Sequence, residues 1–156
     1  MINYLDPLSE EEKLFLQKAP VLVAILIAGA DNKIDKSEIK EALRISRYKP
    51  IKARILLKDF YSSIGDEFEY NLIEEIASLP REARKRTPLI AEELKKLNTI
   101  LPKLDRKFAI QFYESMKDIA KKMAKASGGV LGYISVDYEE SKLMELKMIK
   151  NPASYK

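Results

Sequence analysis

The ten-residue apolar run from Val21 to Ala30 constrains the fold more than any other feature of this sequence. It is too short to span a bilayer core, which needs ~20 residues. By periodicity alone it fits either a buried strand or a buried helix. Because no second strand-like run exists to pair with it, a lone strand would leave its backbone groups without hydrogen-bond partners. We therefore expect a central buried helix over residues 21–30.

Helix start and stop signals occur on both sides of this run. Ser9 with Glu12 three residues later forms a capping box, which predicts a short helix that stops near Pro20. Asp35 with Glu38 repeats the same spacing and predicts another helix, in which apolar residues of the 39–45 segment face inward.

The middle of the chain divides at glycine and proline. Pro50 marks the start of a helix with apolar residues at helical spacing, and Gly65 is placed to end it. Asp66 can cap a following helix, which must stop by Leu79 because Pro80 disfavours helical backbone at the residue before it.

The C-terminal half predicts three more helices. The first begins with Thr87 as N-cap and Pro88 as first residue, with an apolar stripe of Leu89, Ile90, Leu94, Leu97 and Leu101. Asp105 caps the longest helix, which ends at the 127–129 Ser-Gly-Gly run and has an inward face of Phe108, Phe112, Met116, Ile119 and Met123. A last helix starts at Ser135 and buries Leu143, Leu146 and Ile149.

About seven helices with short connections and no convincing strand predict an all-α fold. With no linker composition to divide the chain, we expect one compact bundle over residues 1–156. Residues 126–139 echo residues 30–38: a helix ends, a turn follows, and Ile34 or Ile134 directly precedes an N-cap residue. The echo suggests an internal pseudo-twofold helix-turn-helix repeat.

Composition excludes most catalytic chemistry. The chain has no Cys and no His, which removes thiol nucleophiles, imidazole bases and the usual zinc sites. It has no glycine-rich phosphate-binding motif. Its paired glutamates, at 74–75, 92–93 and 139–140, are sequence neighbours that diverge on a helix instead of facing each other as an acid/base pair. We therefore expect a protein that is not an enzyme.

The N-terminal segment MINYLDPLSEEE has neither the basic nor the apolar region of a signal or transit peptide. Together with the shortness of the apolar run, this predicts no membrane insertion and a cytoplasmic location. The absence of Cys is compatible with that compartment.

Several side chains with oxygen atoms that can bind a metal ion lie in the turn after the apolar run. Asp31, Asn32, Asp35 and Glu38 lie within eight residues, and such hard ligands suit Ca²⁺ or Mg²⁺. The spacing matches only the back half of an EF-hand loop, so an EF-hand is not expected. The alternative is purely structural: Asp35 and Glu38 cap a helix while Asp31 and Asn32 accommodate a turn.

The apolar helix that runs into Ala-Asp-Asn-Lys-Ile-Asp-Lys-Ser-Glu at 30–38, with the Lys-Ala-Ser-Gly-Gly run at 125–129 and Ile-Ser at 134–135, resembles the TerB-like proteins of the tellurite-resistance group. The resemblance covers about a third of the chain. It implies an all-helical bundle with a twofold repeat, a role in tellurite and other stress resistance without established enzymatic activity, and a divalent metal held by acidic turns. The implied ligands are Asp31, Asp35 and Glu38 in the first copy and, less clearly, Asp137, Glu139 and Glu140 in the second.

Two positions depart from the family pattern. Asn32 stands where Gly is common, although Asn also adopts left-handed backbone. Tyr138 stands where the second capping box needs an acid, which puts the second metal site in doubt.

The charge distribution supports a rival function. Residues 81–125 have 13 Lys/Arg against 6 Asp/Glu, and the basic residues concentrate between 81 and 107. Such a strip could neutralise nucleic-acid phosphates, although the interleaved aromatic residues of a single-strand platform are missing. The sequence thus favours a stress-response or scaffolding module that recruits another protein, with nucleic-acid binding as the alternative.

Overall fold

In the computed structural model, the described residues are 3–28, 55–128, 143 and 145–155. They form five α-helices and no strand: α1 (Glu10–Ala28), α4 (Lys58–Ser78), α5 (Ala83–Leu94), α6 (Leu97–Ile100) and α7 (Arg106–Gly128). Three 3₁₀ turns accompany them: η1 (Ile55–Leu57), η2 (Leu101–Lys103) and η4 (Pro152–Ser154). The all-α class is confirmed. The predicted helix of residues 36–45 and both turns of the proposed repeat lie outside the described residues, so the seven-helix count and the repeat stay predictions.

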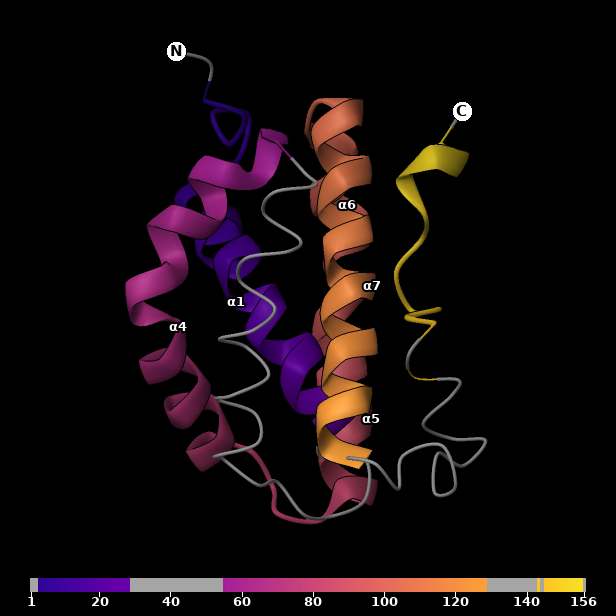
Figure 1. Ribbon diagram of the computed structural model, residues 1–156. Helices are drawn as coiled ribbons and strands as arrows, with labels where there is room; N and C mark the ends of the chain where they lie inside the picture. The colour runs from indigo at the N-terminus through magenta and orange to yellow at the C-terminus, as the bar shows by residue number, and fades with distance from the viewer. Residues whose placement is uncertain (1–2, 29–54, 129–142, 144, 156) are drawn as a thin grey trace.

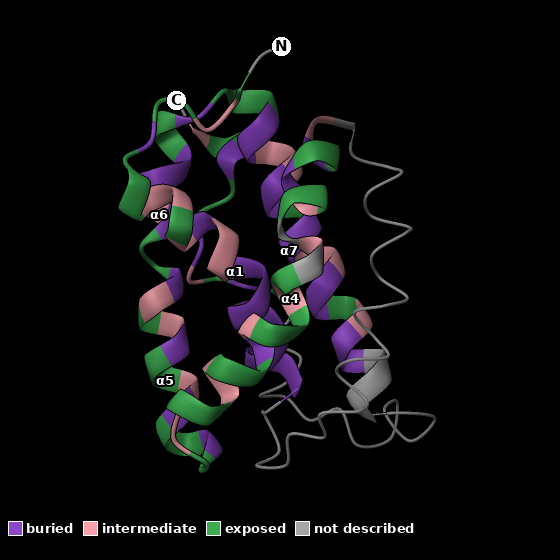
Figure 2. Cartoon of the chain, turned by 90° about the vertical axis from the view of Figure 1, so that its left-hand side faces the viewer, coloured by how far each residue is buried: buried purple, intermediate pink, exposed green. Residues whose placement is uncertain are grey.

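The helix α1 is the centre of the bundle and contacts α4, α5 and α7. Figures 1 and 2 show it enclosed by these three helices. All its side chains from Ala19 to Ala28 are buried. A helix that is apolar all round has no face suited to water, so it is stable only when neighbours cover it on every side. The predicted burial of the apolar run is confirmed for residues 21–28.

The predicted capping box at the start of α1 is confirmed. The Ser9 backbone N–H donates to Glu12 Oε1 at 2.9 Å, and the Glu12 N–H donates to Ser9 Oγ at 3.1 Å. The predicted stop near Pro20 is wrong, because α1 continues through Pro20 to Ala28. A proline inside a helix loses one backbone hydrogen bond and costs ~3 kcal/mol. Burial of the apolar second half of α1 offsets that cost.

The predicted break at Gly65 and Asp66 is also wrong. Both residues lie inside α4, a continuous helix of 21 residues. Glycine in a helix interior costs only ~1 kcal/mol relative to alanine, so one glycine does not end a helix that packs along its length. The predicted stop is confirmed: Leu79 has extended backbone, with φ −97° and ψ 154°.

The helix α5 begins at Ala83, so Thr87 and Pro88 are interior residues and not its cap and first residue. The predicted apolar stripe is divided among α5, α6 and η2. Four of its members are buried, but Leu89 is half exposed.

The prediction for the longest helix is confirmed. The Asp105 carboxylate accepts the Phe108 N–H at 3.2 Å, and α7 then runs for 23 residues to Gly128. Its predicted inward face is buried throughout: Phe108, Phe112, Met116, Ile119 and Met123. The ring of Phe60, from α4, meets Phe108 and Phe112 edge-on at centroid distances of 6.5 and 5.6 Å.

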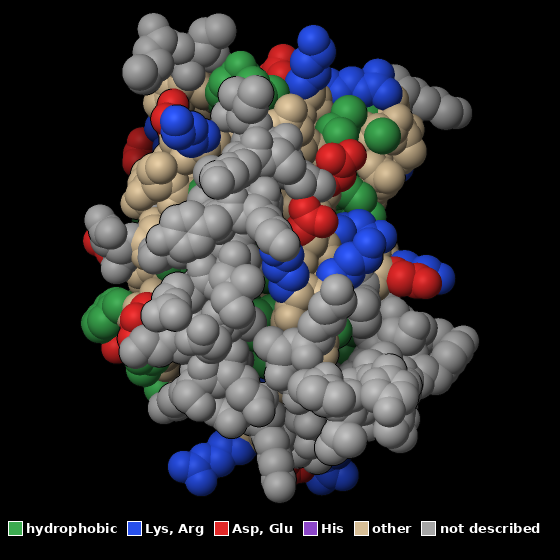
Figure 3. Space-filling model, in the orientation of Figure 1, with side chains coloured by type: hydrophobic (Ala, Val, Ile, Leu, Met, Phe, Trp, Pro, Cys, Tyr) green, Lys and Arg blue, Asp and Glu red, His purple; other side chains and the backbone are tan. Residues whose placement is uncertain are grey.

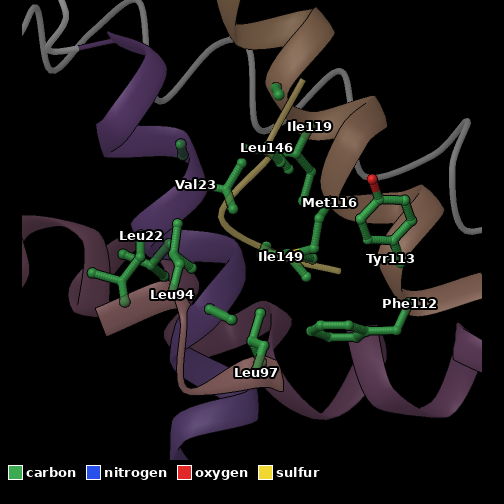
Figure 4. Close-up of a cluster of buried hydrophobic side chains, with 14 of the residues drawn as sticks. Leu22, Val23, Leu94, Leu97, Phe112, Tyr113, Met116, Ile119, Leu146 and Ile149 are labelled. Carbon is green, nitrogen blue, oxygen red and sulfur yellow. The ribbon is translucent and has the colours of Figure 1, made fainter. Parts of the chain in front are cut away.

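The C-terminal segment packs on the bundle as turns. Leu146 and Ile149 are buried as predicted, and Leu143 is half-buried and helical, but residues 145–148 form turns and not a helix. Leu146 itself has a positive φ of 50°. Figure 4 shows both side chains directed at the core cluster formed by α1, α5, α6 and α7. Of the predicted last helix, residues 135–142 lie outside the described residues.

Among the described residues, no helix is both long enough and apolar enough to cross a membrane.

Candidate functional site

All six predicted metal ligands lie outside the described residues: Asp31, Asp35, Glu38, Asp137, Glu139 and Glu140. The two acidic stretches follow α1 and α7 in the sequence. Figure 1 shows both helices ending at the lower end of the bundle, although the stretches themselves are not described. Within residues 3–28, 55–128 and 145–155, no three Asp or Glu side chains are close enough together to hold a metal ion.

Only two polar side chains are buried in the part of the chain that the structure describes, and both bind backbone carbonyls. Arg86 is 2% exposed, and its Nη1 donates to the carbonyls of Pro80 at 3.0 Å and Arg81 at 2.6 Å. Ser115 donates to the Phe112 carbonyl at 2.7 Å and lies 2.7 Å from the Tyr61 hydroxyl. These contacts fix the connection between α4 and α5 and join α4 to α7.

The basic stretch 81–107 is occupied largely by contacts within the chain. Lys95 and Lys96 pair with Glu92 and Glu93 one turn earlier, each at 2.8 Å. Other members of the stretch, in addition to the buried Arg86, make intramolecular contacts through their side chains: Arg84 and Lys85 with Glu82, Lys103 with Glu12, and Arg106 with the Ala153 carbonyl. The structure therefore does not present this stretch as a continuous row of unpaired cations.

A short ion pair between distant segments of the chain joins Lys103 of η2 to Glu12 of α1. Lys103 Nζ lies 2.6 Å from Glu12 Oε2. The hydrogen bond from Lys103 lowers the pKa of the Glu12 carboxyl below its ordinary value of 4.5, and the bond from the Ser9 backbone N–H adds to this effect. Both bonds favour the ionised carboxylate.

Tyr61 and Tyr113 pack against the core, whereas Tyr48 and Tyr133 lie outside the described residues. Burial raises the pKa of the Tyr113 hydroxyl. The same is true of the pKa of Tyr155, whose buried hydroxyl has no hydrogen-bond partner in the described part of the chain. Because both pKa values are raised, neither phenol is shifted toward the neutral pH at which it could act as an acid or a base.

Among the described residues, four large apolar side chains are exposed: Leu14 on α1 (66%), Tyr70 and Ile73 on α4 (65% and 43%), and Leu89 on α5 (50%). Sequence reasoning missed this feature, since it placed Leu89 in an apolar stripe and did not single out the other three as surface residues. One signal was available for α4, where Tyr70 and Ile73 fall off the helical row formed by Phe68, Leu72 and Ile76.

Fold and surface together define an all-helical protein with an apolar interior and a charged exterior. A curated relative from Methanothermobacter thermautotrophicus, the "Uncharacterized protein ORF11'", is 29% identical over 120 residues, which cover 77% of each chain. No protein-family model matches the chain. No solved structure matches it either.

Proposed function

We propose that this protein is a non-catalytic helical module that binds another protein through its outer surface. The four exposed apolar side chains on α1, α4 and α5 carry this proposal. Figure 2 views the bundle from the side of α4, where exposed residues alternate with buried ones along α4 and α5. Large apolar side chains that remain in contact with water are the ones that gain most when a partner covers them. The resemblance to TerB-like proteins supports a scaffolding role in the stress response.

The interior supports the same proposal. Arg86 and Ser115 are used by backbone carbonyls, so neither is arranged to act on a substrate. In the described part of the chain, the side chains that could contact another molecule therefore lie at the surface.

The rival function, nucleic-acid binding through residues 81–107, has less support. Contacts within the chain engage most cations of this stretch, and Arg86 is buried under the α4–α5 connection. A protein that binds phosphates loses affinity steeply as salt rises. The variant Arg84→Gln/Lys85→Gln tests this rival without disturbing buried Arg86. Tight, salt-dependent binding to generic duplex DNA that this variant abolishes would establish the rival function instead.

Photo-crosslinking in cells tests the proposed function directly. A benzophenone amino acid is placed in turn at positions 14, 70, 73 and 89, with exposed Pro102 as the matched control position. We expect a nuclease-resistant protein adduct from at least one of the four positions and none from position 102. Adducts with nucleic acid alone, or no adduct from any of the four positions, would contradict a protein-binding module.

We propose in addition that a hard divalent cation binds the first acidic turn through Asp31, Asp35 and Glu38, and that Asp137, Glu139 and Glu140 form a weaker second site. The proposal is supported by the number of carboxylates, which repel one another until a cation relieves the repulsion. A cation at ~100 times its dissociation constant adds ~2.7 kcal/mol of stability, which a thermal melt resolves.

The metal test compares the wild type with Asp31→Asn and with Asp6→Asn, an exposed aspartate before α1. Ca²⁺ or Mg²⁺ should raise the melting temperature of the wild type and of Asp6→Asn, and should raise that of Asp31→Asn less. Calorimetry without saturable binding at millimolar concentration would remove the site.

A further inference from the structure

The outer face of α4 exposes an apolar strip. Tyr70 and Ile73 are 65% and 43% exposed and lie three residues apart, so they are neighbours on one side of the helix. Ala77, one turn further on, is exposed on the same side. The opposite side of α4 packs on the core through Leu72, which is buried, and Ile76. We refer to Tyr70, Ile73 and Ala77 as the α4 strip.

After Lys58, the charged residues of α4 itself are all acidic. From residue 59 to residue 80 the sequence has no Lys or Arg, and its acidic residues are Asp59, Asp66, Glu67, Glu69, Glu74 and Glu75. Glu67, Glu69 and Glu74 are exposed next to the strip, while Glu75 pairs with Lys18 of α1 at 3.0 Å. Along the left edge of Figure 3, where α4 lies, hydrophobic and acidic side chains are adjacent.

The apolar strip and the acidic residues beside it together indicate which kind of molecule can bind this face of α4. Nucleic acid and anionic lipid surfaces are repelled by the carboxylates. A twofold dimer formed through α4 would bring the same acidic face of two copies together, because such a contact is made by identical patches. A basic segment with an apolar side satisfies both features at once: its apolar residues cover the strip and its cations meet the flanking carboxylates.

We propose that the α4 strip docks a basic amphipathic helix of a protein partner. The inference rests on the proposed protein-binding function and adds to it the surface and the chemistry of the partner. Apolar burial at Tyr70 and Ile73 supplies affinity, and the carboxylates supply the preference for a basic partner and a faster encounter.

The test uses a defined probe, an 18-residue peptide of Lys and Leu with leucines at helical i, i+3, i+4 spacing. A scrambled peptide of the same composition and a Glu/Leu peptide of the same pattern are the comparison probes. Binding to the full chain is measured by fluorescence anisotropy at low and high salt. We expect the patterned Lys/Leu peptide to bind at least ~10-fold tighter than either comparison probe, and to weaken as salt rises.

Variants locate the site. The double variant Tyr70→Ser/Ile73→Asn should weaken binding at least ~10-fold. Pro102→Ser, which changes an exposed apolar residue outside the four side chains of the proposed binding surface, should leave it unchanged. Glu67→Gln/Glu74→Gln should reduce both the affinity and its salt dependence, whereas Glu11→Gln on α1 should not. Circular dichroism and thermal melts are used to check that each variant is folded.

Several outcomes would overturn the inference. Equal binding of patterned and scrambled peptides, equal loss in Pro102→Ser, or no binding by the wild type would each do so. Self-association in sedimentation velocity that Ile73→Asn abolishes would instead assign the strip to a second copy. Protein adducts from positions 14 or 89 but not from 70 or 73 would leave the proposed function standing while this inference fails. The absence of any adduct would remove the proposed function and, with it, this inference.

Discussion

Arg86 shows how one residue can have a role opposite to the one its type suggests. In the sequence it belongs to the basic cluster of residues 81–86, where a cation is expected at the surface. In the structure it is buried, and it donates to the Pro80 and Arg81 carbonyls in the middle of the connection from α4 to α5. A charged group is buried only where polar partners replace its hydration, and here backbone carbonyls do so.

The variant Arg86→Met should therefore lose stability. Methionine fills similar volume but leaves the Pro80 and Arg81 carbonyls without their donor. Hydrogen bonds to charged groups contribute ~1.5–3 kcal/mol, so we expect a loss of that order in urea unfolding. Arg84→Met, which removes the largely exposed neighbouring cation, should change stability by no more than ~0.5 kcal/mol. Equal effects of the two substitutions would contradict the structural role of Arg86.

Glu12 predicts a particular dependence of stability on pH. Its folded-state pKa is lowered, so its ionised form contributes stability that is present above the unfolded pKa and is lost as pH falls through the folded pKa. Glu12→Gln keeps the capping box but removes the charge. The difference in melting temperature between wild type and Glu12→Gln should be largest at about pH 6 and should shrink toward about pH 3. In the background of Lys103→Met the same difference should be reduced at every pH; if it is unchanged, Lys103 is not its source.

At the scale of the element, α1 and α4 are each longer than local signals predict. Pro20 and Gly65 are the residues that a sequence-based prediction uses to end a helix, and both helices pass through them. In α1 the reason is the apolar second half, which contacts three helices. In α4 the reason is an inward row that runs from Phe60 through Leu72 and continues past the glycine.

Ile25→Ala measures the burial of α1. Ile25 is fully buried, and removing a buried aliphatic side chain of this size costs ~2–5 kcal/mol. We expect a loss in this range by denaturant titration. Leu14→Ala, on the exposed side of the same helix, should change stability little. Wild-type stability in Ile25→Ala would count against a central position for α1.

Gly65→Ala distinguishes a continuous α4 from a broken one. In a continuous helix alanine is the better residue, so the variant should gain ~0.5–1 kcal/mol. If Gly65 ended a helix with left-handed backbone, the same change would destabilise the protein. The sign of the shift in melting temperature decides between the two.

At the scale of the whole molecule, the C-terminal segment is tied to the bundle at a site far away in the sequence. Asn98, on α6, donates to the Met148 carbonyl at 2.9 Å and accepts the Lys150 N–H at 2.8 Å. Its side-chain amide thus supplies hydrogen bonds to two backbone groups of the C-terminal segment. Leu146, Ile149 and Pro152 are buried beside this contact. Arg106 adds a hydrogen bond to the Ala153 carbonyl at 2.9 Å.

Asn98→Ala should release this segment without unfolding the helices. Amide hydrogen exchange should accelerate over residues 145–155 while α1 and α7 keep their protection. Thr99→Ala, at the neighbouring exposed position, is the matched control. Uniform acceleration across all helices would show that the segment and the bundle unfold as one unit.

The features that depend on residues three or four apart could be predicted from the sequence alone. These are the caps at Ser9 and Asp105, the inward face of α7, the stop at Leu79 and the all-α class, because helical hydrogen bonds and side-chain rows act over one turn. Tertiary contacts decide whether Pro20 and Gly65 end a helix, whether Pro88 begins one, that Arg86 is buried, and that Leu146 packs as part of a turn. Each of these depends on what a distant segment covers or on which carbonyl it brings near, and such contacts have no fixed spacing along the chain. The acidic residues of the predicted metal site are a sequence pattern whose geometry lies outside the described residues, whereas the α4 strip became visible only when burial separated the two sides of one helix.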